Sequence, residues 1–108
     1  MIEIRKNILI ADEATITSIT KLVTVRNGTD AEMACTVSGN PLDREDVLWT
    51  NQEVKDFNHR AVTQFENGTL TLKFSKATVD DMGKFYCIVN NRIGVEKNAS
   101  TQLIVERE

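Results

Sequence analysis

Two cysteines, Cys35 and Cys87, carry the most reactive side chains of this 108-residue sequence. In an intracellular protein two thiols are commonly small residues buried in the core, whereas in an oxidising compartment they can join as a disulfide. A disulfide between these two residues would close a long loop and stabilise the fold by roughly 4 kcal/mol, according to the chain-entropy model. The cysteine count alone leaves both states open.

Other polar side chains could bind a metal ion or do acid–base chemistry. His59, the only histidine, has no cysteine or carboxylate at the spacing of a metal site, so we expect it in a loop. Asp43, Glu45 and Asp46 could hold a hard cation, but their order lacks the pattern of a calcium loop and favours a solvated loop. The sequence has no Gly-x-Ser-x-Gly motif and no phosphate-binding loop. We therefore predict that the protein is not an enzyme and binds no cofactor or metal.

Composition and length predict one globular domain. Apolar residues make up 41% of the chain and charged residues 27%, which is typical of a folded protein and argues against disorder. The net charge is −3 and the basic residues form no stripe, so a nucleic-acid partner is not expected. No run approaches the roughly 18 apolar residues of a membrane-spanning helix, so direct membrane insertion is not expected either.

Alternation of apolar and polar residues with a period of two dominates the sequence. It is clearest in the stretches DAEMACTV, TLTLKFS and KFYCIVN, as in half-buried β-strands. Turn residues such as Asn27-Gly28, Asn67-Gly68 and Gly83 separate these stretches at intervals of about 8–12 residues. No window has the spacing of three amphipathic helical turns. These patterns predict an all-β domain, either a sandwich or a barrel.

Three features in the same order resemble the I-set modules of the immunoglobulin superfamily. Cys35, Trp49 and Cys87 are spaced like the inter-sheet disulfide of that family and the tryptophan that packs on it. The stretch GTDAEMAC resembles the start of the family's strand B, and DDMGKFYC resembles its Asp-x-Gly-x-Tyr-x-Cys motif before strand F. The segment from Trp49 to Leu70 has room for a short C′ strand near residues 52–55 and a D strand near residues 60–65, but not for the C″ strand of a variable-type domain.

The resemblance implies an immunoglobulin-like β-sandwich of two antiparallel sheets in Greek-key topology. Residues 21–108 would form the I-set domain, and residues 1–20 would be an N-terminal extension or linker plus the first strand. It further implies that Cys35 and Cys87 form a disulfide between the sheets and that Trp49 covers the sulfur atoms.

The family pattern also assigns roles around the turn that precedes strand F. Leu72 and Phe85 are expected in the core, and Asp81 is expected to pair with Arg60. Phe85 stands where the family has a tyrosine, so the ring is kept and the hydroxyl's hydrogen bond to the backbone is lost. The adjacent Tyr86 cannot replace that hydroxyl, because period two points it to the opposite face.

Four apolar or aromatic residues are expected on the outer face of strands C, F and G. They could mark a surface that binds a protein partner, or they could be ordinary surface residues covered by the N-terminal extension or a neighbouring domain. These residues are Leu48, Tyr86, Ile88 and Ile104.

Three Asn-x-Ser/Thr sequons, at Asn27, Asn67 and Asn98, are candidate glycosylation sites. Asn-Gly in two of them is also favoured by hairpin turns without any glycan. We interpret the sequons as favouring an extracellular module of a multidomain adhesion molecule or receptor ectodomain. Such a module would bind a protein partner, homophilic or heterophilic, and neighbouring domains of its own chain. The alternative is an intracellular structural I-set module of a giant, titin-like muscle protein. The N-terminus has no signal-peptide pattern, and we expect the chain to be a fragment of a longer one.

Overall fold

Eight β-strands and three short 3-10 turns account for the regular structure of residues 11–51 and 57–107, the parts of the chain that the computed structural model describes. The strands are β1 (Asp12–Ile19), β2 (Leu22–Arg26), β3 (Ala31–Asn40), β4 (Val47–Asn51), β5 (Ala61–Glu66), β6 (Thr69–Phe74), β7 (Gly83–Val89) and β8 (Lys97–Glu106). The turns are η1 (Arg44–Asp46), η2 (Phe57–His59) and η3 (Val79–Asp81). The predicted D strand corresponds to β5, whereas the predicted C′ strand near residues 52–55 lies outside the described residues.

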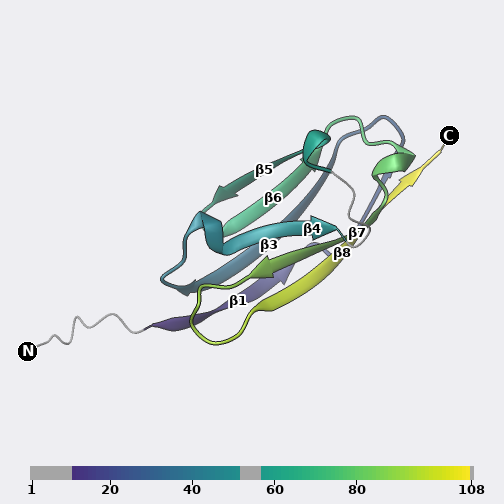
Figure 1. The fold of residues 1–108 in the computed structure, drawn as a ribbon. Helices are drawn as coiled ribbons and strands as arrows, with labels where there is room; N and C mark the ends of the chain where they lie inside the picture. The colour runs from purple at the N-terminus through teal and green to yellow at the C-terminus, as the bar shows by residue number, and fades with distance from the viewer. Residues whose placement is uncertain (1–10, 52–56, 108) are drawn as a thin grey trace, which may run out of the picture.

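The strands form two four-stranded sheets that face each other, in the orders β1-β3-β6-β5 and β2-β8-β7-β4. Among the eight described strands, only the connections β5–β6 and β7–β8 join strands of the same sheet, and every other connection crosses to the opposite sheet, which gives the predicted Greek-key sandwich (Figure 1). Every pairing is antiparallel except that of β2 with β8, which is parallel. β1 begins at one end of the sandwich and β8 ends at the opposite end.

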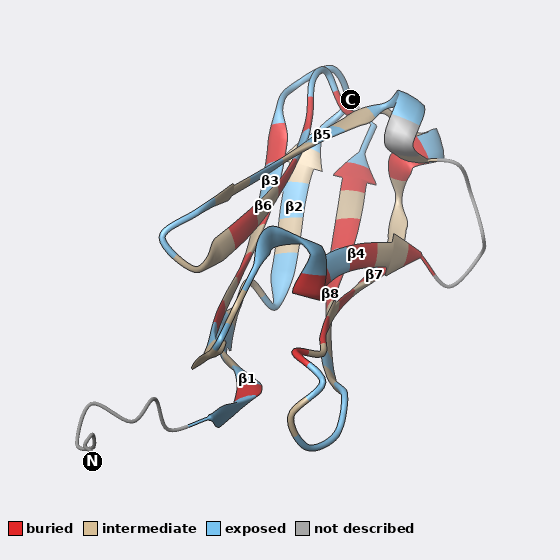
Figure 2. Cartoon of the chain, turned by 60° about the vertical axis from the view of Figure 1, so that its left-hand side comes forward, coloured by how far each residue is buried: buried red, intermediate tan, exposed pale blue. Residues whose placement is uncertain are grey.

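The core lies between the sheets and follows the period-two pattern. Buried and exposed residues alternate along the strands, so each strand turns one row of side chains toward the other sheet (Figure 2). Leu72 and Phe85 are 0% and 1% exposed, respectively, as expected of core residues. The pattern recognised in the sequence therefore sets which side of each strand is buried.

The first strand is part of the sandwich. β1 pairs with β3, and Ala14 belongs to the buried core. The ladder between these strands is irregular, with register shifts between Asp12 and Thr15 and between Ile16 and Ser18. The proposed boundary between residues 20 and 21 stays a prediction.

The core contains one buried hydroxyl that the surrounding residues do not satisfy. Thr101, on β8 opposite Phe85, is 2% exposed, and its Oγ1 has no hydrogen-bond partner among the described residues. A buried hydroxyl without a partner costs free energy relative to an apolar group of the same shape.

Thr101→Val should therefore raise the free energy of unfolding by about 1 kcal/mol, because valine keeps the shape and removes the unsatisfied oxygen. Urea titration of both proteins measures this difference. Thr101→Ser serves as the control, since it keeps the hydroxyl and removes a buried methyl group, and it should destabilise the fold. A valine variant that is less stable than the wild type would contradict the prediction.

Candidate protein-interaction face and its supporting core

A disulfide joins the two sheets at the centre of the sandwich. Cys35 on β3 and Cys87 on β7 are bonded and are both fully buried. Trp49 on β4 lies directly opposite Cys87 in the strand ladder, and its indole Nε1–H donates a hydrogen bond of 3.3 Å to the Leu70 carbonyl oxygen of the other sheet. The tryptophan thus links the sheets a second time, with its polar atom satisfied.

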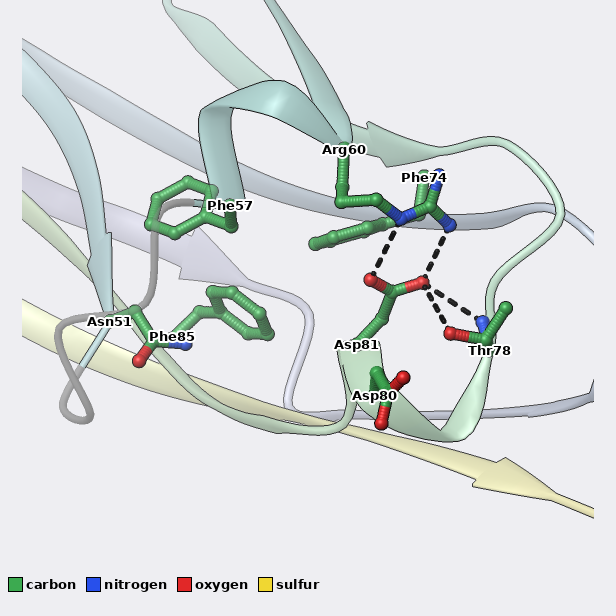
Figure 3. Close-up of a pocket in the computed structure, with 8 residues that line it drawn as sticks. All are labelled: Asn51, Phe57, Arg60, Phe74, Thr78, Asp80, Asp81 and Phe85. Carbon is green, nitrogen blue, oxygen red and sulfur yellow. Dashed lines mark hydrogen bonds and ion pairs between the residues drawn. The ribbon is translucent and has the colours of Figure 1, made fainter.

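Three phenylalanine rings gather beside the η3 turn. Phe85 packs edge-to-face against Phe57, with ring centroids 5.4 Å apart, and it contacts Phe74 at 5.6 Å. A cavity of about 200 Å³ lies among these rings and the η3 turn. The Phe85 ring points toward the turn that carries Asp80 and Asp81 (Figure 3), which is the direction in which a tyrosine hydroxyl would extend. Tyr86 points to the outer face, so it does not supply that hydroxyl.

Arg60 and Asp81 form a bidentate ion pair that connects the start of β5 to η3. Arg60 Nη2 and Nε donate to the two Asp81 carboxylate oxygens at 2.8 and 3.1 Å (Figure 3). The Thr78 backbone N–H donates to the same carboxylate at 2.9 Å. Arg60 also donates to the carbonyl oxygens of Ser75 and Lys76. The pair therefore holds the connection between β6 and β7 in place.

The charge state of Asp81 reflects a balance of two effects. Burial raises its pKa, but the hydrogen bonds from Arg60 and Thr78 and the positive charge of Arg60 outweigh burial, so the pKa lies below its ordinary value. The same pairing raises the pKa of Arg60. Both side chains are thus held in their charged forms.

The outer face of the sheet β2-β8-β7-β4 carries an apolar cluster made of Leu48, Ile88 and Tyr86. Leu48 lies directly opposite Ile88, and Tyr86 lies two residues before Ile88 on the same face of β7. Leu48 is 49% exposed, and the other two residues are half-buried. We name these three residues the apolar cluster. Apolar side chains grouped on an otherwise polar sheet face are a feature of protein-binding surfaces.

Ile104 faces outward as well but lies apart from the apolar cluster. Tyr86 pairs with Ser100 on β8, and Ile104 is four residues further along that strand, or about 13 Å. Lys84 and Gln102 form the row between them. The four residues singled out in the sequence therefore do not form one continuous patch. All four face outward as predicted, but the sequence does not contain the strand register that separates Ile104 from the others.

One of the three sequons lies on the same face. Asn98 is exposed and pairs with Ile88 across β7 and β8, so Leu48, Ile88 and Asn98 form one row across the sheet. A glycan on Asn98 would be attached beside the apolar cluster. Asn27 and Asn67 are exposed in turns away from this row.

The acidic stretch at residues 43–46 is not simply a solvated loop, which corrects the expectation from its composition. Asp46 is 6% exposed, accepts a hydrogen bond from the Asp43 backbone N–H at 2.9 Å, and pairs with Arg92 at 3.0 Å. The spacing Asp-x-x-Asp is a helix-capping pattern that could have been recognised in the sequence. His59 is exposed at the end of η2. Within residues 11–51 and 57–107, no group of three or more His, Cys, Asp or Glu residues could hold a metal ion.

Asn91 is a buried polar residue to which the sequence analysis gave no role. Its side-chain amide bonds to backbone groups of residues far apart in the chain. Its partners come from other strands and loops, so the sequence around Asn91 does not show which bonds its side chain makes.

Comparison with known proteins identifies relatives for most of the chain. Residues 14–105 match the family model of the immunoglobulin I-set domain. The chain is 33% identical to the titin homolog of Caenorhabditis elegans over 81 residues. This alignment covers 73% of this chain and, to the nearest per cent, 0% of the titin homolog. The chain is also 35% identical to the striated-muscle M-protein of Gallus gallus over 78 residues, and this alignment covers 69% of this chain and 5% of the M-protein. The chain therefore spans only a small part of the length of either relative.

A solved structure of the titin domains Z1Z2 in complex with telethonin has the same fold. Its TM-score is 0.80 at 22% sequence identity, covering 92% of this chain and 50% of the other. The extracellular location predicted from the sequons is wrong, because these relatives are muscle proteins and not adhesion molecules or receptors. None of the described residues forms a helix long and apolar enough to cross a membrane.

Phe85→Tyr should raise the free energy of unfolding by roughly 0.5–1.5 kcal/mol, because the added hydroxyl extends toward backbone groups of the η3 turn. Thermal unfolding of the variant and the wild type measures the change. Phe74→Tyr is the control at a neighbouring buried ring. An unchanged or lower midpoint for Phe85→Tyr would show that the hydroxyl finds no partner there.

The ion pair of Asp81 predicts how stability depends on pH. The pKa of Asp81 is lower in the folded state than in the unfolded state, so its contribution is complete above the ordinary aspartate pKa of about 4 and is lost as the pH falls through the folded value. Asp81→Asn should lower the free energy of unfolding by about 1–2 kcal/mol at pH 7 and by less at pH 3. The stability of the variant should therefore fall less steeply with decreasing pH than that of the wild type. Denaturation at both pH values, with Asp80→Asn as the control, measures this. Parallel pH curves for Asp81→Asn and wild type would contradict the assignment.

Proposed function

This chain belongs to the immunoglobulin I-set family, and on that premise we propose that it is a non-enzymatic, intracellular structural module of a large muscle protein. The observation that carries the proposal is its match to two muscle proteins of which it covers only a small part. The aligned segment is 69% of this chain but only 5% of the M-protein, as expected if this chain corresponds to one module among many.

The shape of the domain supports a place in a linear array. β1 begins at one end of the sandwich and β8 ends at the other, so neighbouring modules would join at opposite ends (Figure 1). Both long sides of the sandwich would then remain accessible for partners.

We propose that the apolar cluster of Leu48, Ile88 and Tyr86 binds a protein partner. The cluster lies on the outer face of a regular sheet, where Leu48 is 49% exposed and Tyr86 and Ile88 are half-buried. Titin domains Z1Z2, which share this fold, form a complex with the protein telethonin. In an intracellular setting Asn98 carries no N-linked glycan, so the cluster beside it stays uncovered.

The disulfide is the feature that fits an intracellular location least well, since cytosolic proteins keep most thiols reduced. Cys35 and Cys87 are both 0% exposed, however, so a reductant reaches the bond only when the sandwich opens. If the bond is formed, burial slows its reduction. If the two cysteines are reduced, burial keeps their thiols unreactive.

The location is tested by expressing the chain, fused to a fluorescent protein, in cultured striated muscle cells. We expect a cytoplasmic, periodically striated pattern and a mass that does not change after removal of N-linked glycans. A secreted or glycosylated product would overturn the proposal.

The binding surface is tested in the same cells with Ile88→Asp, which places a charge in the apolar cluster. The striated pattern should become diffuse. Val62→Asp is the matched control, because Val62 is an exposed apolar residue, 69% accessible, on the outer face of the other sheet. A pattern that survives Ile88→Asp would dismiss the cluster as the binding surface without affecting the location.

A further inference from the structure

The same tripeptide, Asn-Gly-Thr, occurs at two turns that the fold holds in different ways. Asn27-Gly28 lies in the turn between β2 and β3, and Asn67-Gly68 forms the tip of the β5–β6 hairpin. Both asparagines are exposed, so contact with water does not distinguish them. An asparagine before glycine can lose its side-chain amide, because the glycine has no side chain that hinders attack by its backbone nitrogen.

The loss of the amide is a reaction of the chain with itself and with water. The backbone nitrogen of the glycine gives its proton to water and bonds to the asparagine Cγ. The side-chain nitrogen takes up a proton and leaves as ammonia, so a five-membered cyclic imide remains. Water then opens one of the two C–N bonds of the imide, which gives either aspartate or isoaspartate. In isoaspartate the main chain runs through the side-chain Cβ. Water is the co-reactant, and nothing is oxidised or reduced.

The turn at Asn27 restrains the attacking nitrogen. The Gly28 N–H donates a hydrogen bond of 2.8 Å to the Ala77 carbonyl oxygen, and the Ala77 N–H donates to the Thr29 carbonyl oxygen at 2.8 Å. The Asn27 N–H donates to the Glu106 carbonyl oxygen at 2.8 Å. The turn is thus bonded to two other segments of the chain. Attack by the Gly28 nitrogen therefore requires a local opening that breaks these bonds.

The hairpin tip at Asn67 leaves the attacking nitrogen available. The Gly68 N–H donates no hydrogen bond to any of the described residues. Asn67 has a φ of 53° and Gly68 a φ of 79°, as in the two-residue hairpin turns that favour Asn-Gly. The Gly68 carbonyl oxygen, in contrast, accepts a hydrogen bond of 2.8 Å from the Val37 N–H. The rotation that brings the nitrogen to Cγ thus takes place within the turn, and the β5–β6 ladder can stay closed.

We infer that Asn67 is a site of spontaneous deamidation in the folded protein and that the fold protects Asn27. The inference is independent of the proposed function. Deamidation would add one negative charge beside Glu66 at the tip of the hairpin. Isoaspartate would also lengthen the main chain of this tight turn by one carbon atom. We therefore expect it to break the hydrogen bond between Gly68 and Val37.

Timed incubation of the 108-residue chain at mildly alkaline pH, followed by peptide mass spectrometry, tests the inference. In urea, with the disulfide reduced, the two sites should react within about threefold of each other, because they share a tripeptide. In the folded protein Asn67 should react at least about tenfold faster than Asn27, since several hydrogen bonds must open at Asn27. Similar rates in the folded protein, or reaction at Asn67 only after unfolding, would overturn the inference.

Matched variants test the protection of Asn27. Asp30 Oδ1 accepts a hydrogen bond of 3.0 Å from the Lys76 N–H, next to Ala77. Asp30→Ala should therefore speed the reaction at Asn27 by about fivefold and leave the rate at Asn67 within about twofold. Asp30→Asn keeps the acceptor oxygen and should retain the wild-type rates. An unchanged rate at Asn27 in Asp30→Ala, or an equal rise at both asparagines, would contradict protection by local bonds.

A variant at the reacting residue provides the second control. Asn67→Gln keeps an amide, but attack on it would have to form a six-membered ring, so the reaction at the hairpin should disappear. The rate at Asn27 should not change. Deamidation that still appears in the hairpin peptide of Asn67→Gln would place the reaction at another residue and refute the assignment.

Native-state hydrogen exchange measures the structural consequence. Ion-exchange chromatography separates the deamidated protein by its added charge. In the isoaspartate form the Val37 amide should exchange at least about fivefold faster than in the unmodified protein. Asn67→Asp adds the same charge without the extra main-chain carbon and should stay within about twofold. Equal exchange in all three proteins would refute the expected change at the turn.

Discussion

The fold depends on joining two sheets at the Cys35–Cys87 disulfide, with Trp49 beside it in the same core. The disulfide joins β3 of one sheet to β7 of the other, and the indole of Trp49 on β4 bonds to the Leu70 carbonyl oxygen on β6. Once these strands are fixed, the period-two pattern decides which side chains enter the core and which face outward. The apolar cluster on the outer face and the aromatic rings beside η3 are both consequences of that register.

Much of this arrangement could be predicted from the sequence because it follows from local rules. Alternation placed Leu72 and Phe85 in the core and Leu48, Tyr86 and Ile88 outside. The resemblance supplied the pairing of Arg60 with Asp81, which the structure shows as a bidentate ion pair. What alternation does not contain is register between strands. The sequence analysis therefore grouped Ile104 with Leu48, Tyr86 and Ile88, although a row of polar side chains separates Ile104 from them.

The buried roles of polar residues whose partners lie far away in the chain could not be predicted from the sequence. Asp46 reads as one acid in a charged loop, yet it is buried against Arg92 from a loop 46 positions away. Asn91 reads as a turn residue after strand F, yet its amide completes the hydrogen bonding of β1. In both cases the need for the residue arises only after folding, when backbone or side-chain groups are removed from water and require a partner. Such sites concentrate at the end of the sandwich where irregular loops meet a strand with a broken ladder.

The same reasoning explains why the sequons misled the assignment of location. Asn27-Gly28-Thr29 forms the turn between β2 and β3, where Thr29 donates through both its backbone N–H and its hydroxyl to the Arg26 carbonyl oxygen. Asn67 adopts a positive φ of 53° in the β5–β6 hairpin, and the Thr69 hydroxyl bonds to that of Thr36 on β3. Asparagine before glycine, followed by threonine, is thus favoured at these two places by turn and strand geometry. Sequons that arise from turn geometry are weak evidence for the compartment, so the match to muscle proteins outweighs them.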